Sequence, residues 1–330
     1  MLFPRRLLST QRRTFFVGIN TGYVTEGEID DRFVDFYQCR SSADLYCAIV
    51  GNVVIPGGYG SNSSTPSITA HGRWPEVAEA IKSQGSRPGV QLATAWNGYR
   101  GTPRFRPPAA KETISASRAV VKSLGGAGAD AVLRGLDESA EIAREAGFEH
   151  LQVHAAHGYL INLLVDHRIN AQAALFLKSL GEWAERQYSK GVETSVRISL
   201  RSGDAEFDAD GREDFYKQIV ALPFDFIDLS SGFYNIDKQR IYPGRPDIVR
   251  ERLADTLAFA NAHPEAQVVY SGRASLYNER LLPRNVHIGI CRDLLANPRF
   301  LQDRTNGCIN SGKCHYYSRG EDHVTCHKWR

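Results

Sequence analysis

The sequence predicts a single closed (β/α)8 barrel, and three observations lead to this prediction. Eight short apolar runs, each bounded by turn residues, alternate with helix-like segments, a pattern typical of a parallel sheet covered on both faces. The eight units extend over about 290 residues, which fits a closed barrel better than an open sheet. No G-x-G-x-x-G motif follows an early strand, which disfavours a dinucleotide-binding open sheet. We therefore expect residues 1–302 to form the barrel and residues 303–330 a C-terminal tail packed on it.

The expected strands are short and rich in β-branched or aromatic residues, as buried parallel strands are. They cover residues 15–20, 46–53, 89–94, 150–155, 194–200, 225–230, 267–272 and 286–291. Helices are expected between most of them, at residues 31–44, 74–85, 134–147, 171–189, 211–221, 246–262 and 274–282. The segment 134–147 has apolar residues at spacings of three and four and stops at Gly147, a residue type common just after a helix.

The connection between the third and fourth expected strands is unusually long. Residues 95–133 are rich in Pro, Gly and Arg and exceed what a strand-to-helix loop needs. In a barrel, such an excursion lies at the C-terminal face and often shapes the active site, although a mobile surface loop is an equal alternative. We expect the glycine-rich stretch 125–130 to be a connector.

Composition excludes several classes of protein. The chain has 330 residues, of which 42% are hydrophobic and 23% charged, which is ordinary for a soluble globular protein and unlike a disordered or disulfide-dense one. Forty basic against 37 acidic residues give a net charge of +3, too balanced to indicate nucleic-acid binding. No apolar run approaches the roughly 18 residues of a membrane helix. We expect a cytoplasmic protein, although the Arg-rich residues 1–13 also resemble a transit peptide.

The strongest chemical signal stands at the end of the fourth expected strand, where the chain reads HAAHGYL over residues 154–160. Residues at the C-terminal ends of barrel strands point into the catalytic mouth. His154 and His157 supply imidazole N–H groups that can polarise a carbonyl, and the Tyr159 phenol can give up a proton. The two histidines could instead share a zinc ion, but no carboxylate at a suitable spacing supports that alternative.

Further strand ends carry residues suited to an anion. Ser271, Gly272 and Arg273 end the seventh expected strand, and Cys291 and Arg292 end the eighth. The loops after strands seven and eight are the standard phosphate site of this barrel, where an arginine can bind phosphate through two hydrogen bonds.

The motif HAAHGYL resembles the H-x-A-[HN]-G-Y-L signature of the old yellow enzyme family, the FMN-dependent NADH:flavin oxidoreductases. Other stretches follow the order of this family along nearly the whole chain. Leu2-Phe3-Pro4 resembles the opening of the family, which favours a mature N-terminus over a transit peptide. The resemblance implies a flavin barrel that uses FMN, with NADH or NADPH as the electron donor and a small molecule as the substrate.

The resemblance also implies a role for individual residues. The first strand end would pack against the flavin, the second would admit the ring through a small residue, and the third and fifth would contact the pyrimidine ring. These residues are Gly18, Ile19, Asn20, Gly51, Gln91 and Arg197. A cation at Arg197 would stabilise the anionic reduced flavin. Ser271, Gly272, Arg273, Cys291 and Arg292 would bind the phosphate end.

In the reaction that the resemblance implies, His154 and His157 hold the activating oxygen of an enone-type substrate. Hydride passes from flavin N5 to the β-carbon, and Tyr159 protonates the α-carbon. Aromatic residues in the loops are candidates for the substrate pocket: Tyr59, Trp96, Tyr99, Phe233 and Tyr234.

Three alternatives stay open at this point. The same barrel and flavin could serve a biosynthetic desaturation, an isomerisation or a nitro reduction. A non-redox barrel could instead bind a phosphorylated ligand. A nucleic-acid partner would rest only on Arg5, Arg6, Arg12 and Arg13, and we expect none; a homodimer is possible.

Two segments depart from the family pattern. After Asn170 a plain helical pattern replaces the usual N-x-R-x-D-x-Y-G-G-S, which puts the usual substrate capping in doubt. In the tail, Cys308, Cys314 and Cys326 resemble the iron–sulfur spacing of members similar to 2,4-dienoyl-CoA reductase, but Ser311 stands where one cysteine would be. We expect no metal; the alternative is zinc on the three thiolates with His315 or His327.

Overall fold

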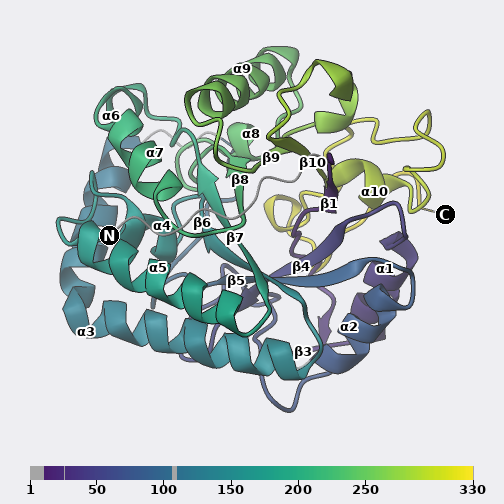
Figure 1. Cartoon of the computed structure of the whole chain (residues 1–330), viewed down its shortest axis with the longest axis horizontal. Coiled ribbons are helices and arrows are strands. Elements are labelled where there is room, and N and C mark those ends of the chain that lie inside the picture. The colour runs from purple at the N-terminus through teal and green to yellow at the C-terminus, as the bar shows by residue number, and fades with distance from the viewer. Residues whose placement is uncertain (1–10, 26, 106–109, 330) are drawn as a thin grey trace.

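A computed structural model shows a closed eight-stranded parallel barrel surrounded by helices (Figure 1). The structure describes residues 11–25, 27–105 and 110–329, so Leu2-Phe3-Pro4, Arg5 and Arg6 lie outside the described residues. The strands pair around the barrel in the order β1-β10-β9-β8-β7-β6-β5-β4. Their bounds are β1 Thr14–Phe16, β4 Cys47–Val54, β5 Arg87–Ala93, β6 His150–Ala155, β7 Glu193–Ser199, β8 Phe226–Ser230, β9 Val268–Ser271 and β10 Val286–Ile290. The predicted barrel is confirmed, and each of the eight strands overlaps its expected range.

The helices that cover the barrel mostly follow the apolar periodicity of the sequence. They are α1 Asp31–Arg40, α2 Trp74–Lys82, α3 Ala110–Glu145, α4 Leu160–Val165, α5 Ala173–Ser189, α6 Ala205–Ala209, α7 Arg212–Val220, α8 Lys238–Ile241, α9 Pro246–Ala262 and α10 Arg292–Ala296. A small hairpin of β2 (Val24–Thr25) and β3 (Glu28–Ile29) precedes α1. The side chain of Asp30 accepts a hydrogen bond from the Arg32 N–H and caps the start of α1.

Two expectations about local structure were wrong. The stretch 125–130 is part of the long α3, which kinks at Gly125 (φ 62°, ψ −172°) and then continues as a helix. Burial of Leu136, Ala140 and Ala143 against the barrel outweighs the weak helix propensity of the glycines. The expected helix 274–282 is two separate 3₁₀ turns, Ala274–Leu276 and Glu279–Leu281, because the Asn278 side chain accepts a hydrogen bond from the Arg280 N–H and starts a new turn.

The inside of the barrel combines an apolar cluster with buried polar side chains. Phe15, Cys47, Ile49, Phe226 and Val269 form an apolar cluster. On the strands β5 to β8, buried polar side chains also point inward, and the parallel register places them beside one another. The neighbouring pairs are Gln91 with Gln152, His154 with Arg197, and Arg197 with Asp228.

The segment 303–329 contains one 3₁₀ turn, Tyr317–Arg319, and runs beside β1 and α10 (Figure 1). The Val324 N–H donates to the Thr21 carbonyl at 2.8 Å, and the Trp329 indole donates to the Leu295 carbonyl at 2.8 Å. Within the described part of the chain, no helix has both the length and the apolar character that crossing a membrane would require.

Candidate active site

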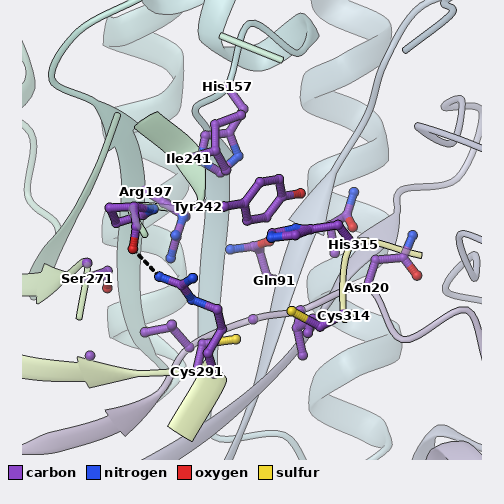
Figure 2. A pocket seen from close by; sticks show the side chains of 18 of the residues that line it. Asn20, Gln91, His157, Arg197, Ile241, Tyr242, Ser271, Cys291, Cys314 and His315 are labelled. Atoms are coloured by element: carbon purple, nitrogen blue, oxygen red, sulfur yellow. Dashed lines mark hydrogen bonds between the residues drawn. The ribbon is translucent and has the colours of Figure 1, made fainter. Parts of the chain in front are cut away.

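One cavity of about 190 Å³ opens at the C-terminal ends of the barrel strands. Most of the residues predicted for the site line it together (Figure 2). They are Gly18, Ile19, Asn20, Gln91, His154, His157, Tyr159, Arg197, Tyr234, Ser271, Gly272, Arg273, Cys291 and Arg292. Residues from β1, β5, β6, β7, β9 and β10 or from the turns that follow these strands therefore meet at one place, as the barrel geometry requires.

The two histidines leave β6 through a sharp turn. His157 adopts a left-handed backbone conformation (φ 65°), which is unusual for a residue other than glycine and indicates that its surroundings hold it there. Its N–H donates to Ser199 Oγ at 2.9 Å, and its ring Nε2 lies 2.7 Å from Ser230 Oγ. The ring centroids of His154 and His157 are 4.9 Å apart. The turn thus presents both imidazoles to the cavity on a supported backbone.

Burial keeps both imidazoles neutral. Desolvation, together with the nearby Arg197 cation, lowers the pKa of His154 to about 3. Desolvation, with His154 and Arg197 adding to it, lowers the pKa of His157 well below its usual value. A neutral imidazole can donate a hydrogen bond to a substrate oxygen without carrying a charge of its own.

The pKa values of the buried histidines predict that the protein loses stability in mild acid. The pKa of His154 is about 3 and that of His287 about 4, both lowered chiefly by desolvation from 6.5. Between pH 6.5 and about 4 the unfolded chain binds these protons and the folded chain does not. Stability is therefore complete above pH 6.5 and falls by about 1.4 kcal/mol per pH unit for each histidine.

Urea unfolding between pH 7 and pH 4.5 measures this slope. The variant His154→Asn should show a slope smaller by about 1.4 kcal/mol per pH unit, because one of the protons no longer binds. An unchanged slope in the variant would contradict the assignment. Glu193, whose pKa is lowered to about 2, contributes only below its ordinary value near 4.5 and does not interfere in this range.

The phenol of Tyr159 is buried beside the histidines. Its ring centroid lies 5.5 Å from that of His154, 5.4 Å from that of Tyr99 and 6.1 Å from that of Tyr234. Desolvation, with the neighbouring tyrosines Tyr99 and Tyr234 adding to it, raises the pKa of Tyr159 well above 10. The group therefore keeps its proton at neutral pH, as a proton donor must.

Arg197 enters the cavity from β7 and forms a buried ion pair. Its Nη1 donates to Asp228 Oδ2 at 2.5 Å, and the two side chains are 9% and 0% exposed. The carboxylate offsets the cost of burying the guanidinium. One end of this guanidinium thus has a fixed partner while the side chain lines the cavity.

Two glycines allow Gln91 to lie close to the barrel wall. A Cβ on Gly18 would lie 3.2 Å from the amide carbon of Gln91, and a Cβ on Gly51 would lie 2.9 Å from Gln91 Cβ. Asn52, not Gly51, lines the cavity. In this structure Gly51 makes room for the Gln91 side chain at the edge of the site.

At the opposite end, the strand ends β9 and β10 bring two arginines together. Arg273 has a left-handed backbone (φ 67°), and its Nη1 lies 3.5 Å from Asp293 Oδ1. Arg292 Nη1 donates to Asn310 Oδ1 at 2.9 Å, and its Nη2 donates to the Pro243 carbonyl. A phosphate at Arg292 would therefore replace neutral partners, which is favourable for a charged hydrogen bond.

The aromatic residues predicted for the substrate pocket divide into three groups. Tyr234 lines the main cavity. Trp96, Tyr99 and Phe233 line a second cavity of about 130 Å³, which His157 also borders. Tyr59 is 47% exposed and lines neither of these two cavities.

Several residues of the cavity wall were not predicted. Tyr242 and His315 have ring centroids 4.4 Å apart, and Figure 2 shows them inside the cavity near Gln91. Cys314, Tyr316 and Tyr317 also line it. Four of these five residues belong to the tail, and the only signal in the sequence was the concentration of Cys, His and Tyr there.

Within residues 11–25, 27–105 and 110–329, no three His, Cys, Asp or Glu side chains gather so that they could hold a metal ion. Cys308, Cys314 and Cys326 are free thiols.

The donor set of the cavity fits FMN. Gln91 and Arg197 suit the polar edge of a flavin ring, and Arg273 and Arg292 suit a phosphate. In addition, the buried His154 Nδ1 has no hydrogen-bond partner among the described residues, which is the state expected of a group that meets a ligand. A (β/α)8 barrel with this arrangement defines a flavin-dependent oxidoreductase.

The comparisons with known proteins indicate similarity to one family. The model of the NADH:flavin oxidoreductase / NADH oxidase family matches residues 14–176. An NADPH dehydrogenase of Geobacillus sp. (strain WCH70) is 27% identical over 252 residues, which are 68% of this chain and 67% of that protein. An NADH-dependent flavin oxidoreductase of Aspergillus parasiticus is 24% identical over 232 residues, 61% of this chain and 51% of that protein. Residues 14–176, just under half of the chain, are thus similar to the NADH:flavin oxidoreductase / NADH oxidase family. This similarity and the names of the relatives indicate FMN as the cofactor and NAD(P)H as the electron donor.

Solved structures agree on the fold. A 2-naphthoyl-CoA reductase superposes with a TM-score of 0.70 at 12% identity over 96% of this chain, and a histamine dehydrogenase from Rhizobium sp. 4-9 with a TM-score of 0.69 at 16% identity. The chain spans 54% and 50% of these two structures, about half of each.

Proposed function

We propose that this protein uses NAD(P)H to reduce an activated carbon–carbon double bond of a small, enone-type substrate. The observation that supports this most is the position of His154, His157 and Tyr159 on one wall of the cavity that Gln91 and Arg197 also line. Two neutral N–H donors and a protonated phenol are what a conjugated carbonyl needs at its oxygen and its α-carbon.

Different residues of the chain have different roles in the proposed reaction. His154 and His157 hold the carbonyl oxygen of the substrate and withdraw electron density from the double bond, since both are neutral donors at neutral pH. Tyr159 holds a proton for the α-carbon. FMN, when bound, supplies the hydride. Arg197 places positive charge beside the ring that carries the electrons.

The walls favour a largely uncharged substrate. Tyr159, Tyr234, Tyr242, His157 and His315 face the same cavity. These side chains offer aromatic surface with a few hydroxyl and N–H groups, which suits a planar conjugated carbonyl compound. A homodimer and a cytoplasmic location stay predictions.

An absorbance spectrum of the purified protein, followed by anaerobic addition of NADPH and then NADH, tests the proposal. We expect a flavin band that bleaches with pyridine nucleotide and recovers when 2-cyclohexenone is added. A band that bleaches but does not recover with enones would reject this substrate class and favour a desaturase, isomerase or nitro reductase. A colourless protein that does not take up FMN would reject the flavin function.

A further inference from the structure

We infer that Asp228 and Gln152 are positioning residues that set the direction of the Gln91 side-chain amide, so that Gln91 presents its carbonyl oxygen to an N–H group of the ligand. The inference deepens the proposed function at the same site and rests on FMN as the ligand. It concerns two residues that do not line the cavity themselves. The inference rests on a row of three buried side chains, Asp228, Gln152 and Gln91, which are linked by hydrogen bonds.

Asp228 anchors the row. Its side chain is fully buried and accepts hydrogen bonds from Arg197 Nη1 at 2.5 Å, from Ser271 Oγ at 2.5 Å and from Gln152 Nε2 at 3.3 Å. A carboxylate paired with a guanidinium offers only acceptor oxygens. The group that faces it from Gln152 must therefore be the NH₂ end of the amide and not the carbonyl end.

The orientation of the Gln152 amide then determines the orientation of the Gln91 amide. With its NH₂ end toward Asp228, Gln152 turns its Oε1 toward Gln91, whose Nε2 donates to it at 2.5 Å. Turning Gln152 around would place its oxygen against the Asp228 carboxylate and its NH₂ against the NH₂ of Gln91. Gln91 and Gln152 are 3% and 1% exposed, and an unpaired buried polar group costs about 1–3 kcal/mol, so the reversed arrangement is strongly disfavoured.

The barrel holds the three side chains in this arrangement. Gln91 and Gln152 are register partners on β5 and β6. Asp228 lies on β8, where it is the register partner of Arg197 on β7. The absence of a side chain at Gly18 leaves room for the Gln91 amide in this position, since a Cβ there would lie 3.2 to 3.3 Å from the amide atoms. The hydrogen bond to Gln152 therefore holds the Gln91 amide in this position.

The result is a directed hydrogen-bonding group at the cavity. Gln91 keeps its carbonyl oxygen and one N–H for a ligand, because the other N–H is bound to Gln152. This pair complements a ring edge in which an N–H stands next to a carbonyl, such as the N3–H and carbonyl edge of a flavin. Gln91 thus selects a ligand with a free imide N–H, and Asp228 enforces that choice through Gln152.

The test compares the dissociation constants of FMN and of FMN methylated at N3, measured by fluorescence quenching on the apoprotein. The variant Gln152→Leu removes the link between Asp228 and Gln91. We expect it to bind FMN about tenfold more weakly and to lose most of the preference for FMN over the methylated compound. Ser195→Ala is the matched control: it removes the other acceptor of Gln152 Nε2, Ser195 Oγ at 3.1 Å, but leaves the Asp228 carboxylate in place, so the preference for FMN over the methylated compound should be retained and the FMN affinity should fall much less than in Gln152→Leu.

Gln152→Met, whose side chain is unbranched and of similar length, provides a second variant in case Gln152→Leu does not fold, and the same two changes are expected of it. If either folded variant retains the affinity and the preference of the wild type, the inference is wrong. It is also wrong if Ser195→Ala loses as much as Gln152→Leu, because the effect would then come from a general disturbance of the barrel interior. A wild-type protein that binds no FMN would overturn the proposed function and the inference together.

Discussion

Replacing Arg197 with methionine should lower the free energy of unfolding by about 3–5 kcal/mol. The variant leaves the Asp228 carboxylate buried and without its cation, since the pair is separated by 2.5 Å and Asp228 is fully buried. Ser271 and Gln152 still donate to the carboxylate, but neutral donors compensate a buried charge only partly. Urea unfolding at pH 7 measures the loss.

The double variant Arg197→Met, Asp228→Leu separates the cost of the unpaired charge from other effects of the substitution. Removing both charges should restore more than half of the lost stability, because replacement of a buried ion pair by apolar groups is often nearly neutral. FMN affinity and the rate of flavin reduction should stay low in the double variant, since the cation that we propose to lie beside the flavin is still missing. A single variant within 1 kcal/mol of the wild type would contradict the buried-pair argument.

Replacing Tyr159 with phenylalanine should slow the reoxidation of the reduced enzyme by an enone by about 10²–10⁴-fold, the usual contribution of a positioned proton donor. The substitution removes one oxygen from a phenol that is buried and protonated at neutral pH. Reduction by NAD(P)H needs no proton from this group, so its rate should change little. Stopped-flow absorbance at the flavin band measures both half-reactions separately.

Tyr234→Phe is the control for this experiment. Tyr234 lines the same cavity, and its ring centroid lies 6.1 Å from that of Tyr159, but we assign it no proton transfer. Its variant should therefore reoxidise within a few-fold of the wild-type rate. If Tyr159→Phe retains full enone turnover, Tyr159 is not the proton donor.

Much of the fold could be predicted because the relevant information is local. Each barrel strand is a short apolar run, and burial on both faces of a parallel sheet requires such runs wherever the strand lies. The segment HAAHGYL likewise carries its two imidazoles and its phenol within seven consecutive residues. Once these residues stand at a strand end, barrel topology alone directs them to the C-terminal mouth.

The glycine-rich stretch 125–130 shows where local information fails. Its composition predicts a connector, yet it is helical from Gly126 onward because the residues that follow pack against the barrel. Tertiary packing of an apolar face outweighs propensity by more than the glycines cost.

The partners of the site residues are also beyond the reach of sequence patterns. Tyr242 meets His315 across 73 positions of the chain, and Arg292 bonds to Pro243 and Asn310. Asp228 and Gln152 carry no motif, but they form the buried row that directs Gln91. Periodicity and motifs report which way a residue faces on its own strand. Which side chain meets it depends on how the barrel closes and where the tail folds back, and these depend on contacts between residues far apart in the chain.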